Sequence, residues 1–411
     1  MSLSASEPQK AGFRLSQLIY DTRYRSATIQ VVAMFAFMLA VGWVVSNAIQ
    51  NLAALGKTFS FGFLFETSGY DVNQRLLEYS SQSTHGRAAV LGILNTLVLA
   101  AAGCVTATML GVLAGVGRLS KNWIVARLMT FYVEGFRNVP VLLWIIMITA
   151  VVNESLPSPR AYRGEETGAF VLTNRGFYVP EPIFSRGLGD LDLGLFKISL
   201  DLMAIIAVLL AGLYLARRIG RAADAKQAAT GVRPHVFWYR AAAIFLPLIA
   251  YLVAVGFELK YPELKGFNFQ GGTFFRDSFI GLWLALSLYT GAFIAENVRA
   301  GIQAVPHGQS EAAFALGLRP GRTMKLVILP QATRVIVPPM ISQYLNLTKN
   351  TSLAIAVGYM DATGTLGGIT LNQTGKEMET LLLLMGFYLV ISLSISFVMN
   401  VYNERMKLKE R

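Results

Sequence analysis

The sequence predicts an all-α integral membrane protein with about eight transmembrane helices. The chain has 411 residues, of which 54% are hydrophobic and only 15% are charged, and its mean hydropathy is +0.49. A soluble domain carries about 25% charged residues, so lipid is the expected solvent. The apolar runs are long and continuous, whereas the strands of a membrane barrel alternate over about ten residues, so helices are expected.

Eight apolar stretches are long enough to cross a hydrocarbon core of about 30 Å, which requires about 20 helical residues. The predicted spans are 28–49, 88–116, 127–153, 197–216, 240–257, 278–298, 333–357 and 379–402. The first run has no clear small-residue cleavage site, so it is interpreted as a retained anchor and not as a signal peptide.

The distribution of basic residues predicts that both termini lie in the cytoplasm. If the N-terminus is inside, the inside segments hold 22 Lys and Arg residues and the outside segments hold 11. Lys and Arg are enriched in cytoplasmic loops, and an even number of spans agrees with this orientation. The net charge of +12 is therefore attributed to membrane topology rather than to nucleic-acid binding, because the basic residues form short clusters between apolar runs.

Two long segments between the spans are expected to be external. Segment 154–196 is rich in proline and glycine and is expected to form a loop. Segment 50–87 carries phenylalanines at alternate positions from 59 to 65, which favours an aromatic interfacial segment over a strand. The single cysteine, Cys104, and three scattered histidines indicate neither a disulfide framework nor a metal site.

The predicted cytoplasmic loop 299–333 has the signals of two short helices. Pro306 and Pro320 can each begin a helix, and Gly317 lies where a left-handed C-terminal cap is expected. Pro330 is expected to break the chain before the next span. The expected helices are 307–316 and 320–329. Such an element cannot bury its own apolar side chains, so it either docks on a partner protein or lies on lipid headgroups.

Charged residues in or near the spans are candidates for function, because they usually face protein or water and cost at least about 2.5 kcal/mol at mid-bilayer. Glu134 with Arg137, and Glu296 with Arg299, have the three-residue spacing that places two side chains on one helix face. Each pair can be an interfacial ion pair or can form part of a gate or substrate contact. Lys349, in the outer half of its span, can extend outward or meet a carboxylate.

The sequence lacks a phosphate-binding loop. ATP hydrolysis by that fold needs a glycine-rich loop ending in Gly-Lys-Ser/Thr, whereas Gly375-Lys376 is followed by Glu377. We therefore expect no nucleotide on this chain.

The loop motif resembles the cytoplasmic loop of importer-type ABC transporter permeases. It consists of Glu311-Ala312-Ala313, three residues, Gly317, nine residues and then Val327-Ile328-Leu329-Pro330. Val327 stands where isoleucine is commoner, which is a mild departure. Residues 132–140, 286–309 and 347–353 resemble the polar amino acid subfamily. In this resemblance the residues that couple to the ATPase are Glu311, Ala312, Ala313, Gly317, Leu329 and Pro330.

The resemblance also implies a domain organisation, that of the long permeases of general L-amino acid importers. The transmembrane domain 88–402 comprises a five-helix core and a two-helix insertion. The core is 88–153 and 278–402, the insertion is 154–277, the N-terminal region with the first helix is 1–87, and the tail is 403–411.

The function implied by the resemblance is that of the membrane-spanning permease subunit of an ATP-driven, binding-protein-dependent amino acid importer in the bacterial inner membrane. The resemblance implies a transport subunit and not an enzyme, and ATP and Mg²⁺ are expected on two separate ATPase subunits. The other expected partners are a similar second permease, a periplasmic amino acid binding protein and the lipid bilayer. The alternative is an ion-coupled secondary transporter, and an integral membrane enzyme would require clustered His, Asp or Ser residues.

A zwitterionic amino acid needs one anionic and one cationic contact, and Glu296 and Lys349 are the hypothesised pair. Gly291, Gly135 and Pro140 are expected to make room by thinning or breaking helices. The candidates for the substrate path are Glu134, Arg137, Thr290, Gly291, Glu296, Lys349 and Asn350.

Overall fold

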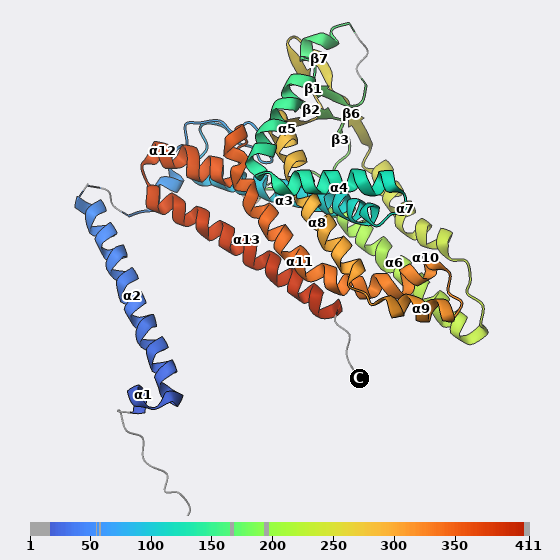
Figure 1. Ribbon diagram of the computed structural model, residues 1–411. Helices are drawn as coiled ribbons and strands as arrows, with labels where there is room; N and C mark the ends of the chain where they lie inside the picture. The colour runs from blue at the N-terminus through green and yellow to red at the C-terminus, as the bar shows by residue number, and fades with distance from the viewer. Residues whose placement is uncertain (1–16, 55, 57–58, 165–167, 193–196, 407–411) are drawn as a thin grey trace, which may run out of the picture. The chain divides into compact units, whose positions relative to one another are not determined.

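The computed structural model describes residues 17–54, 56, 59–164, 168–192 and 197–406 (Figure 1). Within these ranges, eight helices are long and apolar enough to cross a membrane, which confirms the predicted helical membrane fold. The chain divides into two compact units, Met1–Phe61 and Gly62–Arg411. The polar residues 1–16 and the tail residues 407–411 lie outside the described residues.

The first unit consists of the short helix α1, Gln17–Tyr20, and the 33-residue helix α2, Thr22–Ala54, which contains the predicted first span. Large apolar side chains are exposed all around α2, including Phe37, Leu39 and Trp43. A helix that is apolar on all sides is expected to lie in lipid.

The core of the second unit is built around α8, Asp277–Gln303, which packs against α3, His85–Arg118, along most of its length. The helices α5, Val141–Ser155, and α11, Leu329–Asn350, also pack on α8, while α13, Glu377–Met406, packs on α11. Small residues allow the close approach of α3 and α8. A Cβ atom at Gly111 would lie only 2.5 Å from the Cγ2 atom of Ile294. Small residues at contacts are the usual solution for packing helices in lipid.

The third predicted span, 127–153, is not one helix, and that prediction was wrong. The chain forms α4, Trp123–Asn138, and then α5, with Val139 and Pro140 in extended conformation at ψ 137° and 136°. Proline lacks the backbone N–H for a helical hydrogen bond, and its ring disfavours helical geometry in the preceding residue. Glu134 and Arg137 therefore lie on α4, before the span.

The insertion between α5 and α8 contains strands that were not predicted. The helical turn η2, Pro159–Tyr162, precedes them. The strands are β1 Val171–Thr173, β2 Gly176–Val179, β3 Glu181–Phe184, β4 Asp190–Asp192, β5 Lys197–Ser199, β6 Phe257–Lys260, β7 Glu263–Lys265, β8 Asn268–Gln270 and β9 Thr273–Arg276. One antiparallel sheet has the order β1-β2-β9, and the others pair as β3-β6, β4-β5 and β7-β8. Figure 1 shows labelled strands of the insertion beyond one end of the helices, which we call the β end.

The same insertion contains the hairpin of α6, Leu200–Thr230, and α7, Phe237–Ala254. Helix α6 continues well beyond its predicted span 197–216. Helix α6 begins directly after strand β5, and helix α8 begins directly after strand β9. Both helices therefore start at the β end and run away from it. The opposite end, which carries α9, we call the α9 end (Figure 1).

The loop helices differ from the prediction in one respect. Helix α9, His307–Ala315, is separate, but α10, Pro320–Thr323, continues through a π-helical turn η3, Met324–Ile328, directly into α11. The expected break at Pro330 is therefore wrong. In the wider turn the Leu329 N–H donates to the Met324 carbonyl, and this widening relieves the clash that a proline ring makes with the preceding turn.

Two irregular segments complete the second unit. In the predicted external segment 50–87, a short helical turn η1, Gly62–Phe65, is present instead of a strand, and Phe63 is buried while Phe59, Phe61 and Phe65 are exposed. Between α11 and α13 the chain forms η4, Thr351–Val357, η5, Thr363–Thr370, and α12, Leu371–Thr374.

Candidate functional site

A network of charged side chains joins three helices at the α9 end. Glu296 of α8 accepts a hydrogen bond from Arg118 Nη1 of α3 at 2.6 Å and one from Arg299 Nε at 3.2 Å. Arg137 Nη1 of α4 lies 3.8 Å from Glu296, and Arg118 Nη2 donates to Glu134 at 3.4 Å. The predicted Glu296–Arg299 pair is therefore present.

The other predicted pair, Glu134 with Arg137, is not formed, and each of the two residues has a different partner. Arg137 faces Glu296, and its guanidinium lies 5.4 Å from the ring centroid of Phe293, while Glu134 binds Arg118. The two carboxylates thus hold three arginines from three helices. The Arg118 side chain is only 11% exposed, and removing one partner of a buried ion pair leaves the other charge uncompensated. The network therefore fixes the relative positions of α3, α4 and α8.

Helix α9 ends as its sequence predicted. Gly317 adopts the left-handed conformation at φ 74°, the Leu318 N–H donates to the Ala313 carbonyl, and the Gly317 N–H donates to the Phe314 carbonyl. This hydrogen-bond pattern defines a Schellman C-cap.

The side chains of α9 are divided between the protein and the surroundings. Ala313 is buried, whereas Ala312 is exposed, Phe314 is 49% exposed and Leu316 is 81% exposed. Glu311 bonds to His307 Nδ1 of the same helix at 3.0 Å, which shows an intrahelical partner for this residue. Leu329 and Pro330, at the start of α11, are also exposed.

One side-chain hydrogen bond connects α9 to α11, and the short segment 304–306 joins α9 to the end of α8. Arg299 Nη1, which belongs to the charged network, donates to Gln303 at 2.6 Å, four residues before α9 begins. Gln331 of α11 donates to Gln309 of α9 at 3.1 Å. A displacement of α9 would therefore act on α11 through the Gln331–Gln309 hydrogen bond and on α8 through the three residues that join the two helices.

The hypothesised contact between Glu296 and Lys349 is wrong, because the two residues lie at different depths. Glu296 binds Arg118, whereas a Cβ atom at Gly103 of α3 would lie 3.2 Å from Leu347, two residues before Lys349. Fifteen residues of α3 separate these levels, which corresponds to roughly 20 Å along a helix. Lys349 is exposed at the far end of α11, next to the half-buried Asn350.

Thr290 and Gly291 lie in the packing interface of α8. Both residues are buried, and a Cβ atom at Gly291 would lie 3.0 Å from the Tyr132 hydroxyl and 3.3 Å from the Ala107 carbonyl. The Tyr132 hydroxyl donates to the Leu288 carbonyl at 2.7 Å. Gly291 thus makes room for neighbouring helices, and a part for either residue in a substrate path stays a prediction.

A buried polar cluster near the β end was not predicted. Asp361 is fully buried and accepts hydrogen bonds from the Gly364 N–H at 2.8 Å and the Tyr388 hydroxyl at 3.4 Å. Burial raises the pKa of Asp361 to about 6. The adjacent Ala362 N–H donates to Thr96 of α3 at 3.0 Å. The sequence signal available for this cluster was an Asp three residues before a glycine, which is weak.

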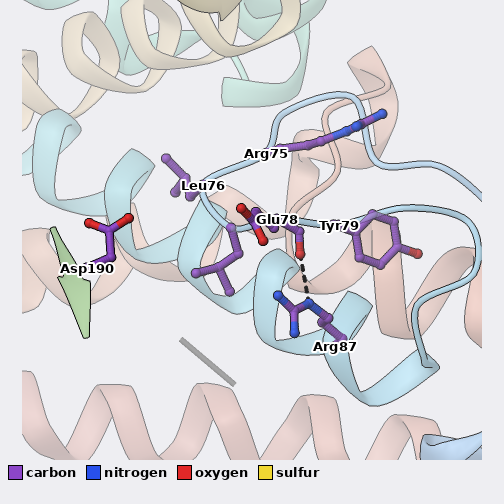
Figure 2. Close-up of a pocket in the computed structure, with 7 residues that line it drawn as sticks. Arg75, Leu76, Glu78, Tyr79, Arg87 and Asp190 are labelled. Atoms are coloured by element: carbon purple, nitrogen blue, oxygen red, sulfur yellow. Dashed lines mark hydrogen bonds between the residues drawn. The ribbon is translucent and has the colours of Figure 1, made fainter. Parts of the chain in front are cut away.

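Two cavities accompany these elements. An outer pocket of about 550 Å³ is shown in Figure 2, where Arg87 Nε donates to the Glu78 carbonyl at 2.8 Å. Its lining residues are Arg75, Leu76, Leu77, Glu78, Tyr79, Arg87 and, from strand β4 of the insertion, Asp190. A second cavity of about 470 Å³ lies between α3, α8, α11 and α13 and is mostly apolar, with the hydroxyls of Thr108 and Tyr344 in contact at 2.8 Å.

Comparisons with known proteins identify the family. The family described as the binding-protein-dependent transport system inner membrane component matches residues 234–408. The chain is 54% identical to the glutamate/glutamine/aspartate/asparagine transport system permease protein BztB of Rhodobacter capsulatus, over 99% of both chains. It is 43% identical to the general L-amino acid transport system permease protein AapQ of Rhizobium johnstonii, over 97% of this chain and 96% of that one.

A third relative is the putative amino-acid ABC transporter permease protein YhdX of Escherichia coli, which is 42% identical over 94% of this chain and 95% of that one. These relatives are permeases of ABC systems and not ion-coupled secondary transporters, so the predicted function is confirmed over its alternative. The chain therefore belongs to the family of multi-pass membrane permease subunits of ABC amino acid importers.

Proposed function

We propose that this chain forms one half of the translocation path of an ATP-driven importer in the bacterial inner membrane, and that α9 receives the movement of the ATPase. The observation that carries this proposal is the structure of α9. It is a capped helix outside the spanning segments that exposes Phe314 and Leu316. It follows α8 after only three residues, and the Gln331–Gln309 hydrogen bond ties it to α11. Exposed apolar side chains on a short, well-formed helix suit a groove on a partner protein.

The partners follow from this arrangement. Two ATPase subunits, which carry ATP and Mg²⁺, bind below α9, a periplasmic binding protein delivers substrate at the β end, and a second, similar permease completes the path. Asp190 of strand β4 lines the outer pocket of Figure 2, so in this scheme the pocket belongs to the delivery side. This chain supplies no catalytic residue and no cofactor of its own in this scheme.

The proposed substrates are amino acids with acidic or amide side chains. The relative from Rhodobacter capsulatus is named for glutamate, glutamine, aspartate and asparagine, and it matches this chain over nearly its whole length. The charged network contributes three arginines against two carboxylates, an excess of positive charge that favours anionic side chains over cationic ones.

Replacing Phe314 tests the docking role. In the reconstituted importer, Phe314→Ser removes an exposed apolar side chain from α9 and is expected to lower ATPase co-purification and substrate-stimulated ATP hydrolysis about tenfold. The matched control is Phe267→Ser, which alters a similarly exposed side chain of the insertion, 61% exposed. Equal activity of wild type and Phe314→Ser would contradict the coupling role of α9.

The C-cap offers a second, milder test. At φ 74°, Gly317 has a left-handed conformation that costs an alanine about 1–2 kcal/mol. Gly317→Ala should therefore weaken substrate-stimulated hydrolysis several-fold while basal ATPase activity is kept. Gly321→Ala is the control, because Gly321 has an ordinary backbone conformation and nothing within 4 Å of an added Cβ atom.

A further inference from the structure

The α6–α7 hairpin packs chiefly on itself. Its two helices meet along a stripe of small, buried residues on α6, and no residue of α7 is buried. The stripe consists of Gly212, Ala216, Gly220 and Ala223. Large apolar side chains such as Leu210, Phe245 and Ile249 are more than half exposed. In the spanning part of the hairpin, these side chains are suited to contact with lipid.

The contacts between α6 and α7 give the depth of the residues that follow. A Cβ atom at Gly212 would lie 2.9 Å from the Ala243 carbonyl, and one at Gly220 would lie 3.6 Å from the guanidinium carbon of Arg240. The Arg240 backbone is thus level with about residue 216 of α6, and its side chain extends one turn further toward the hairpin turn. Long basic side chains extend in this way from the edge of a bilayer toward water.

Aromatic residues lie at the same depth. Phe237, Trp238 and Tyr239 begin α7 and are 72%, 78% and 70% exposed. By the same register they are level with Arg217 and Arg218 of α6, which are exposed as well. Trp and Tyr are enriched where a membrane meets water, because their rings are amphipathic. The first turn of α7 is therefore expected at the level of the lipid headgroups.

The charge at this depth is strongly positive. Residues 202–257 contain six Lys and Arg residues and a single acidic residue, Asp224. Asp224 bonds to Arg233, beyond the aromatic residues, at 2.8 Å. Within the described parts of the chain, no acidic side chain forms an ion pair with the four other arginines of the hairpin. These arginines are Arg217, Arg218, Arg221 and Arg240.

We propose that these four arginines, together with Trp238 and Tyr239, bind the phosphate headgroup of an anionic phospholipid. The guanidinium group donates two parallel hydrogen bonds to phosphate oxygens, which an ammonium cannot do. The aromatic residues favour lipid over a protein partner, because they place the arginines at headgroup level and not beyond it. Basic clusters at this position between membrane helices are a known form of lipid recognition.

Lipid retention by the intact importer tests this proposal. The complex is purified in mild detergent with equal amounts of phosphatidylglycerol and phosphatidylcholine, and the lipids that remain bound are counted by native mass spectrometry. Wild type should retain phosphatidylglycerol at least fivefold over phosphatidylcholine. The triple variant Arg217→Gln, Arg218→Gln, Arg221→Gln should lose that preference, whereas the three corresponding Lys substitutions should keep part of it.

The matched control changes the charge equally at the other end of the molecule, with Arg160→Gln, Arg163→Gln and Arg175→Gln, all exposed in the insertion. It should leave lipid retention unchanged. Equal retention of both lipids by wild type, or an unchanged preference in the first triple variant, would overturn the proposal. So would a first variant that keeps its lipid preference but no longer co-purifies with the ATPase, because the arginines would then serve protein docking. If that variant does not fold, Arg218→Gln with Trp238→Leu provides the same comparison.

Discussion

Helices α8 and α7 are both apolar enough to cross a membrane, yet their surroundings are opposite. In the 18-residue apolar stretch of α8 that could cross a membrane, 67% of the residues are buried inside the protein, whereas in the corresponding stretch of α7 the share is 0%. Their mean hydropathies are nearly the same, so hydropathy does not distinguish a helix packed by protein from one that faces lipid. The difference lies in the fit of particular side chains against neighbours, which is tight for α8 and open for α7.

The largest expected effect comes from filling the contact between α3 and α8. Gly111→Leu places a side chain against Ile294 and the Gly291 carbonyl, which an added Cβ would approach to 2.5 Å and 2.9 Å. Overpacking against backbone should cost about 3 kcal/mol and abolish the folded complex in size-exclusion chromatography. Gly386→Leu on α13, where nothing lies within 4 Å, should be tolerated. A folded Gly111→Leu variant would show that α3 and α8 are less tightly packed than described.

The next effect concerns the charged network, which has no equivalent on α7. Glu296→Gln leaves three arginines without their shared carboxylate, so we expect a loss of about 2 kcal/mol, reduced from the 3–5 kcal/mol of fully buried pairs because Glu296 is 24% exposed. Uptake in proteoliposomes should fall at least tenfold. Glu134→Gln, on a carboxylate that is 50% exposed, should cost less than about 1 kcal/mol. Similar losses of stability and uptake in both variants would contradict the larger contribution that we assign to Glu296.

The buried Asp361 makes stability depend on pH. Its pKa is raised to about 6 by burial, against about 3.9 in an unfolded chain, so the folded state binds its proton more tightly. The free energy of unfolding should therefore rise by up to about 2 kcal/mol as the pH falls from 7 to 4. The difference in thermal midpoint between wild type and Asp361→Asn, measured across this range in detergent, isolates the effect. A difference that does not change with pH would contradict the raised pKa.

The smallest expected effect comes from removing one methyl group from a side chain of α8 and, for comparison, from a side chain of α7. Ile294→Val on α8, where the side chain is fully buried, should cost about 1 kcal/mol. Ile249→Val on α7, where it is 53% exposed, should cost less than about 0.5 kcal/mol. The measurement is the shift in thermal midpoint of each variant relative to wild type, in the same detergent. Equal shifts would mean that Ile249 of α7 also packs against a protein neighbour.

Most of the helical fold could be predicted because the hydrocarbon thickness sets the length of an apolar run. The C-cap at Gly317 was predictable for a local reason, namely that glycine adopts a left-handed conformation without a steric cost. The strands were missed because β2 pairs with β9, nearly a hundred residues later, and such short segments have no periodicity of their own. The division at Pro140 was missed although the polar residues Glu134, Arg137 and Asn138 stand just before it, because the sequence is apolar again on both sides of them.

The candidate residues show the same division between local and long-range information. The spacing of Glu296 and Arg299 correctly placed them on one helix face, whereas the contact between Glu296 and Lys349 was wrong by roughly 20 Å of helix. The sequence by itself determined the number of spans, the cap of α9 and the Glu296–Arg299 pair, since these depend on residues close together along the chain. Only the tertiary structure decided that Arg118 and Arg137 face Glu296, because helix periodicity specifies a face but not the neighbour that covers it.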